Sequence, residues 1–146
     1  MSEDSAIRLG AVESSRDRSP ESVLRAIFAR WAHGDMTAGA ELLAEDIRFS
    51  AAQPEGQVRA DGRTAMNRFN RDFLASWDRW WVELHDLERR SPVAFLASGT
   101  QHGIGKGSHA QTSMPTFIAI SFRNDEIVQL EFFYERARAV AALADG

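Results

Sequence analysis

The side chains best suited to acid–base chemistry lie in the second half of the chain. His102 stands at the expected end of a strand, beside a glycine-rich turn, where its imidazole could exchange a proton near neutral pH at the mouth of a pocket. Tyr134 is the one polar tip on an apolar strand face, and its hydroxyl can donate to a ligand carbonyl or to the backbone. With Glu83 as an auxiliary acid, these residues form the candidate catalytic set. The alternative for His102 is a half-exposed histidine at a strand end.

Two further motifs have simpler structural explanations. Glu83 and His85 would share one face of a strand, but one histidine and one acid are too few ligands for a metal, so no metal site is predicted. The run GIGKGS at residues 103–108 could cradle a phosphate, yet no helix is expected to follow it. A hairpin turn whose glycines supply positive φ explains the run better. No cofactor is predicted.

Large apolar side chains recur at positions that would face a central space. The chain has four tryptophans, enough to line a pocket as well as to fill a core. Plain core packing accounts for most of these residues, and a ligand-binding pocket is the alternative. The expected lining residues are Trp31, Phe49, Phe73, Trp77, Trp80, Leu130 and Phe132.

The last third of the chain predicts a long antiparallel hairpin. Residues 111–122 and 126–134 both have strand composition, and the polar stretch between them is too short for a parallel crossover. This hairpin is the frame on which a pocket would be built.

The second strand of this hairpin has two contrasting faces. Alternation places Leu130, Phe132 and Tyr134 on the face toward the central space. Gln129 and Glu131 fall on the opposite face, where we expect solvation or a dimer contact.

Upstream patterns add helices before the strands. Ser19-Pro20 predicts a helix that ends near Gly34, and Asp35 and Asp61 are expected to cap the two helices that follow. The other expected elements are strands at 46–50, 80–88 and 93–102 and helices at 62–78 and 136–143. Helices segregated from four consecutive strands predict an α+β fold, a curved antiparallel sheet wrapped around N-terminal helices.

Composition restricts the classes of function. The 146 residues fit one domain at 19–146, preceded by a flexible polar arm at 1–18. The arm has no apolar core of a secretory signal, and no stretch is apolar enough to span a membrane, so a cytoplasmic protein without a membrane partner is expected. The net charge is −4 and Lys106 is the only lysine, which disfavours nucleic acid as a partner.

Five short segments together resemble a known family. They are WAHGD at 31–35, LLAED at 42–46, DGR at 61–63, GIGKGS at 103–108 and FRNDEIV at 122–128. In this order they are similar to the SnoaL-like group of the nuclear-transport-factor-2-like superfamily, which includes small polyketide cyclases and ketosteroid isomerases. The resemblance implies a conical α+β barrel of cystatin-like type with a pocket between sheet and helices, and a homodimer formed through the sheet.

The catalytic residues that this resemblance implies are missing. Positions that hold a tyrosine and an aspartate in the isomerases correspond to Ile27 and Ser50, which cannot supply the donor and the base. The aspartate on the last strand of the cyclases corresponds to Phe132, and a register error of one residue would put Glu131 there.

The sequence therefore predicts a pocket protein that binds a small apolar molecule, working as a homodimer. The first alternative is an enzyme of the cyclase, isomerase or hydratase type that uses His102, Tyr134 and Glu83 on a hydrophobic or polyketide-like substrate. The second is a structural dimerisation module whose central space is filled by side chains.

Overall fold

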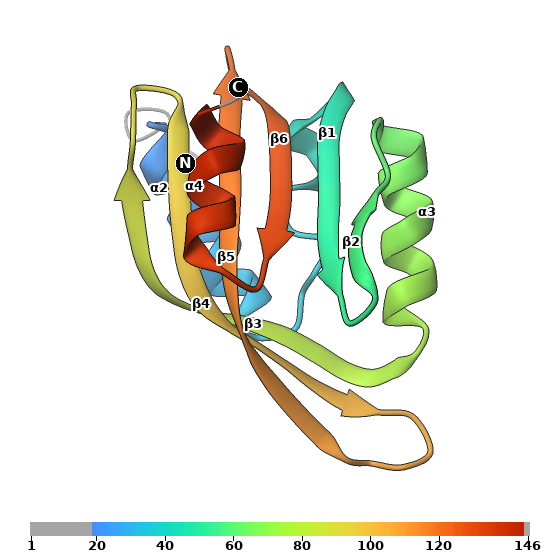
Figure 1. The fold of residues 1–146 in the computed structure, drawn as a ribbon. Helices are drawn as coiled ribbons and strands as arrows, with labels where there is room; N and C mark the ends of the chain where they lie inside the picture. The colour runs from blue at the N-terminus through green and yellow to red at the C-terminus, as the bar shows by residue number, and fades with distance from the viewer. Residues whose placement is uncertain (1–18, 145–146) are drawn as a thin grey trace, which may run out of the picture.

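A computed structural model describes residues 19–144, and the arm expected at residues 1–18 lies outside the described residues (Figure 1). The helices are α2 (Pro20–Trp31), the short 3-10 helix η1 (Ala40–Leu42), α3 (Arg63–Leu74) and α4 (Arg136–Ala144). The strands are β1 (Leu43–Gln53), β2 (Gly56–Arg59), β3 (Trp77–Arg89), β4 (Ala94–Gly105), β5 (Gln111–Arg123) and β6 (Glu126–Phe133). No helix among the described residues is long and apolar enough to cross a membrane.

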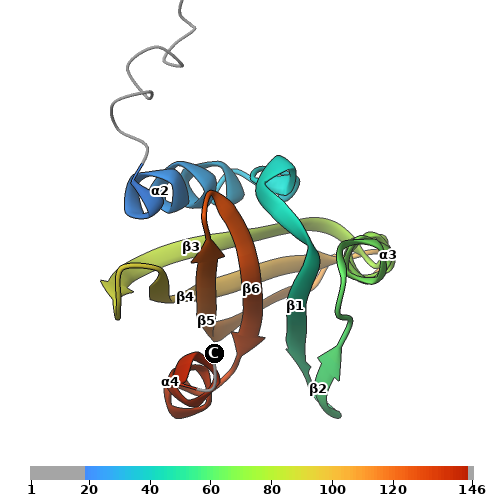
Figure 2. The ribbon, with the colours of Figure 1, turned by 90° about the horizontal axis from the view of Figure 1, so that it is seen from above.

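All six strands form one curved sheet in the order β2-β1-β6-β5-β4-β3. Neighbouring strands are antiparallel except β1 and β6, which are parallel. The elements β2, α3, β3, β4 and β5 lie between these two strands in the sequence. The sheet curves without closing, and α2 and α4 lie on opposite sides of it (Figure 2). The predicted α+β cone is confirmed, with one parallel pair in a sheet that was expected to be wholly antiparallel.

The C-terminal hairpin is also confirmed. β5 and β6 pair from Phe117 opposite Phe133 to Arg123 opposite Glu126, leaving two residues in the turn. The first of these, Asn124, has a φ of 57°, a left-handed conformation that asparagine tolerates better than most side chains.

Helix α2 begins as its sequence predicts. The Ser19 side chain accepts a hydrogen bond from the Ser22 amide at 3.2 Å, and Pro20 occupies the first helical turn. Leu24, Ile27, Phe28 and Trp31 form its buried stripe. The helix thus covers the inner side of the sheet with apolar side chains.

The second helix expected after Asp35 is absent from the described residues, apart from the single turn of η1. Asp35 instead accepts a hydrogen bond from the Thr37 hydroxyl at 3.0 Å and pairs with Arg30. Gly34 and Gly39 have φ values of 91° and 89°. Because these backbone conformations interrupt a right-handed helix, the segment forms successive turns.

Helix α3 differs from its prediction at both ends. Gly62 is the N-cap residue, and Asp61 does not cap the helix, because its carboxylate accepts from the Phe49 amide at 3.0 Å and from Arg59. The helix ends at Leu74 rather than near residue 78, since Trp77 already pairs with Gly105 in the sheet. Long-range strand pairing has overridden a helical pattern. Strand β2, which holds Arg59, has no counterpart in the sequence prediction.

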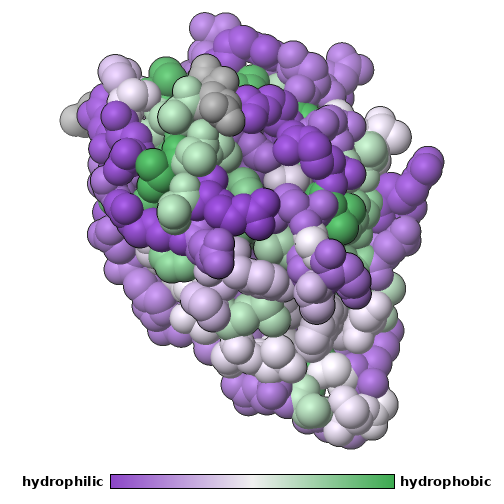
Figure 3. Space-filling model, viewed as in Figure 1, coloured by the Kyte–Doolittle hydropathy of each residue, from purple (hydrophilic) through white to green (hydrophobic). Residues whose placement is uncertain are grey.

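The sheet carries apolar clusters on both faces. The larger one lies on the inner side and joins α2 and α3 to β1, β3 and β6 through residues such as Phe28, Phe49 and Leu130. The smaller one packs α4 against β4, β5 and β6 through Leu96, Ala119 and Phe133. Helix α4 therefore covers part of the outer face; around it lie hydrophilic residues in the upper part of the view and residues of mostly intermediate hydropathy in the lower part (Figure 3).

Candidate functional site

A cavity of about 630 Å³ lies between the inner face of the sheet and helices α2 and α3. This volume is within the range typical of sites for small organic molecules. Its walls come from α2, α3 and side chains of β1, β3, β4, β5 and β6, so the cone is not filled by its own core. The second alternative, a module with a packed interior, does not fit this open space.

Every residue predicted to face the central space lines this cavity. They are Trp31, Phe49, Phe73, Trp77, Trp80, Leu130 and Phe132. Several of the rings contact one another; those of Phe73 and Trp80 pack edge to face, with centroids 4.8 Å apart at 89°. Sequence reasoning located this wall because alternation and helical period put these side chains on inward faces.

Gly103 makes room for part of the wall. A Cβ atom at this position would lie 2.6 Å from the rings of both Trp77 and Trp80, closer than atoms in contact can approach. The centroids of the two rings are 4.9 Å apart, and both rings pack against the β4 backbone at Gly103. The first glycine of the stretch therefore leaves space for two tryptophan rings. The rest of the stretch leads into the hairpin turn that the sequence predicts.

The lining is almost devoid of ionisable side chains. Among residues 19–144, the only ones that line the cavity are Arg71, exposed on α3, and Tyr134, just after β6. Burial and the nearby charge of Glu55 raise the pKa of Tyr134 above its ordinary value of 10.0, so its hydroxyl keeps its proton. No carboxylate or imidazole of the described residues faces the cavity, which leaves it without a group that exchanges protons readily near neutral pH.

His102 and Glu83 lie on the opposite face of the sheet. The His102 ring contacts the Ser113 hydroxyl at 2.8 Å and the Glu83 carboxylate at 3.1 Å, and it stacks on Trp81 at 5.0 Å. Its neighbour Gln101 lines the cavity, so strand alternation turns the imidazole outward.

His102 was expected at a strand end near the pocket mouth, but β4 continues to Gly105 and holds it within the strand. The structure thus joins His102 to Glu83 and separates both from Tyr134.

His85 shares this outer face and contacts the Thr100 hydroxyl at 2.8 Å. Among the described residues, no group of three or more His, Asp or Glu side chains is placed to hold a metal ion.

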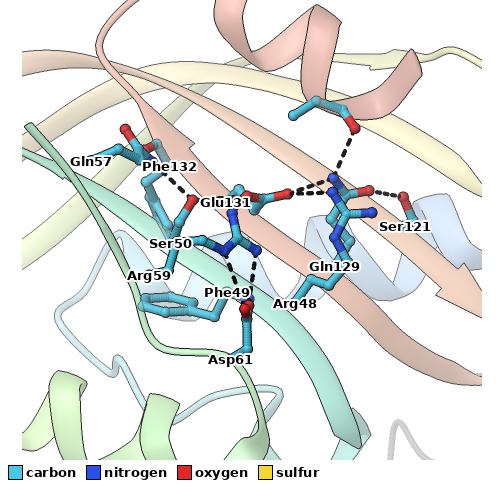
Figure 4. Close-up of polar contacts among 11 residues, drawn as sticks. Arg48, Phe49, Ser50, Gln57, Arg59, Asp61, Ser121, Gln129, Glu131 and Phe132 are labelled. Carbon is cyan, nitrogen blue, oxygen red and sulfur yellow. Dashed lines mark hydrogen bonds and ion pairs between the residues drawn. The ribbon is translucent and has the colours of Figure 1, made fainter. Parts of the chain in front are cut away.

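A polar network that sequence reasoning missed lies between β1, β2 and β6 (Figure 4). Glu131 is only 2% exposed and accepts hydrogen bonds from Ser50 at 2.8 Å, Arg59 at 2.9 Å and Gln129 at 2.7 Å. Arg48 approaches the same carboxylate at 3.3 Å. The hydroxyl of Ser50, at the position where the resemblance implies a base, is therefore committed to this network.

Of the two expectations for Gln129 and Glu131, solvation is wrong because both side chains are buried, and a dimer contact stays a prediction; their predicted strand face is correct. Gln129 donates to the Ala142 carbonyl of α4 at 3.1 Å, and Arg59 reaches over from β2. These two elements cover the face. Burial alone would raise the pKa of Glu131, but the hydrogen bonds from Gln129 and Ser50 and the Arg59 guanidinium lower it below its ordinary value. The carboxylate is thus held ionised away from the cavity.

Residues 24–130 match the model of the SnoaL-like domain family, and the chain belongs to this family. No curated protein matches the sequence significantly.

Solved structures agree on the fold at low sequence identity. An NTF2-like protein of Burkholderia thailandensis is 16% identical, with a TM-score of 0.67 over 86% of this chain and 97% of its own. A proposed polyketide cyclase of Xanthomonas campestris pv. campestris is 20% identical, with a TM-score of 0.61 over 89% and 99%. A protein with a ketosteroid isomerase-like fold from Catenulispora acidiphila, in complex with trimethylamine, is 19% identical, with a TM-score of 0.65 over 86% and 94%.

Proposed function

We propose that the protein binds a small, mainly apolar molecule in the cavity and that the cavity side chains do not carry out acid–base catalysis. One observation carries this proposal: an aromatic-walled space of about 630 Å³ has no carboxylate or imidazole among the described residues that line it. Transfer of apolar surface from water to such walls favours binding. The Catenulispora acidiphila protein shows that a small molecule accompanies a protein of similar fold.

The rival function is a cyclase, isomerase or hydratase that uses His102, Tyr134 and Glu83. It would need an imidazole or a carboxylate next to the substrate, whereas His102 and Glu83 contact each other on the outer face of the sheet. The geometry therefore favours binding. A homodimer formed through the sheet stays a prediction of the family resemblance.

The binding proposal is tested with the neutral fluorophore N-phenyl-1-naphthylamine, whose emission rises in apolar surroundings. We expect saturable binding to the wild-type protein and a loss of at least about tenfold in affinity for Thr112→Trp, because Thr112 lines the cavity and a bulky indole would occupy its opening. The matched control is Ser113→Trp, the next residue of β5, whose side chain contacts His102 on the other face. It should bind the probe as the wild type does.

Two outcomes would contradict the proposal. One is a wild-type protein that does not bind the probe. The other is a probe that binds Thr112→Trp and wild type equally well, since the emission would then report a site outside the cavity. Circular dichroism of both variants confirms that each retains its fold.

A further inference from the structure

The cavity wall carries polar groups at one level of the sheet. Continuing the parallel register from Ala51 opposite Phe132, Gln53 lies level with Tyr134. Continuing the β5–β6 register from Phe117 opposite Phe133, Thr116 also lies level with Tyr134. All three line the cavity. Hydroxyl and amide groups from β1, from β5 and from the residue after β6 thus lie at one level of the cavity wall.

Gln101 adds a polar group from β4. The residue opposite Thr116 on β4 is Gly99, which has no side chain, and Gln101 is the next residue on the same face. It too lines the cavity. We call Gln53, Gln101, Thr116 and Tyr134 the polar arc.

The polar arc has hydrogen-bonding capacity that the protein leaves unused. Thr116 is only 1% exposed, yet its hydroxyl forms no hydrogen bond with any described residue. The amide of Gln101 and the hydroxyl of Tyr134 likewise have no hydrogen bond among residues 19–144. Gln101 and Tyr134 are half-buried, and all three residues line the cavity, so their polar groups are available to a partner that enters it.

From this we propose that the polar arc is a recognition site for an oxygen atom of the ligand, so that the molecule bound is a neutral, largely aromatic or alicyclic compound with a carbonyl group at one end. The inference rests on the proposed function. Hydroxyl and amide groups of the arc can all donate, which fits a carbonyl oxygen as acceptor. The apolar remainder of the ligand lies against the rings of Trp31, Phe73 and Trp80.

The charges near the polar arc favour a neutral ligand. Glu55 is close enough to influence the Tyr134 hydroxyl electrostatically, and its carboxylate would repel an anionic group at that end. Arg71, the one cation among the described residues of the lining, is exposed on α3, where water screens its charge. A ligand carboxylate would lose its hydration shell and would gain only neutral donors beside a negative charge. The free-energy cost of this transfer is larger than that of placing a neutral carbonyl there.

Competition against N-phenyl-1-naphthylamine tests the inference with three compounds of matched shape: 2-acetylnaphthalene, 2-ethylnaphthalene and 2-naphthoate. One hydrogen bond predicts that the ketone binds about five- to tenfold more tightly than the hydrocarbon. The carboxylate should bind most weakly.

At least one of the variants Thr116→Val, Gln101→Leu and Tyr134→Phe should weaken the ketone about three- to tenfold, and all three should leave the hydrocarbon unchanged. Thr100→Val is the matched control, because the Thr100 hydroxyl contacts His85 on the outer face.

The results separate the two proposals. The carbonyl-recognition proposal is overturned if the wild type binds ketone and hydrocarbon with equal affinity, or if the variants weaken the binding of both compounds alike. Neither result affects the proposal that the cavity binds a ligand. Tightest binding of 2-naphthoate would overturn the neutral ligand class. If none of the compounds displaces the fluorophore, the cavity site fails and the arc fails with it. Should Thr116→Val not fold, the variants at the half-buried residues Tyr134 and Gln101 still decide the outcome.

Discussion

Replacing Glu131 with alanine is expected to lower the free energy of unfolding by about 2–4 kcal/mol, among the largest effects of any single polar substitution in this chain. The carboxylate is 2% exposed and accepts from Ser50, Gln129 and Arg59. Alanine would leave the Ser50 hydroxyl and one amide N–H of Gln129 buried without an acceptor, while Gln129 still donates to the Ala142 carbonyl. The arginines are close to half exposed and can turn to water, which limits the loss.

Urea denaturation followed by circular dichroism measures this change. Glu126→Ala is the matched control, because Glu126 lies on the same strand and is exposed, so its loss should cost less than about 0.5 kcal/mol. Glu131→Gln separates charge from shape, since the amide keeps one acceptor in place. A cost for Glu131→Ala no larger than that of the control would show that the network does not stabilise the fold.

The same carboxylate makes part of the stability depend on pH. Because the folded state lowers the pKa of Glu131, its contribution is present above its ordinary value of 4.5 and is lost as pH falls through the lower folded value. The difference in unfolding free energy between wild type and Glu131→Gln should therefore shrink as pH is reduced below about 4.5. A difference that stays constant would contradict the lowered pKa.

Replacing Gly99 with alanine is expected to lower the free energy of unfolding by about 3 kcal/mol or more. A Cβ atom at this position would lie 2.1 Å from the backbone oxygen of Glu83. The clash is with backbone next to an irregularity of the β3–β4 register between Leu84 and Asp86, so no side-chain rotation can relieve it.

Thermal and urea unfolding of Gly99→Ala, compared with Ser98→Ala, check this expectation. Ser98 is the preceding residue of β4, and its side chain makes no hydrogen bond with the described residues, so alanine should be tolerated there. Equal stabilities of the two variants would mean that β3 can move away from β4 at little cost.

Local periodicity was sufficient to predict the inner wall of the cone. Alternation along β6 correctly placed Phe132 inward and Glu131 outward, because a strand has only two faces. The start of α2 at Ser19-Pro20 was equally predictable from capping chemistry.

The features that were predicted wrongly, or not at all, depend on contacts between residues distant in the sequence. Burial of Glu131 needs α4 and the unpredicted strand β2, which no local pattern of β6 reveals. Because β4 runs past its expected end, His102 lies within a strand, and alternation turns its side chain outward. Helix α3 stops early because Trp77 pairs with Gly105. The polar arc combines side chains of four separate strand segments, so only the register of the sheet brings it together.

The central claim is that the cone holds a ligand, and the most direct measurement is the crystal structure of the protein grown with 2-acetylnaphthalene. We predict that the ring system lies between Phe73, Trp80 and Phe132, with the carbonyl oxygen within hydrogen-bonding distance of Tyr134 or Thr116. A cavity that stays empty at a saturating concentration of the ketone, or a ligand bound elsewhere on the protein, would contradict the account.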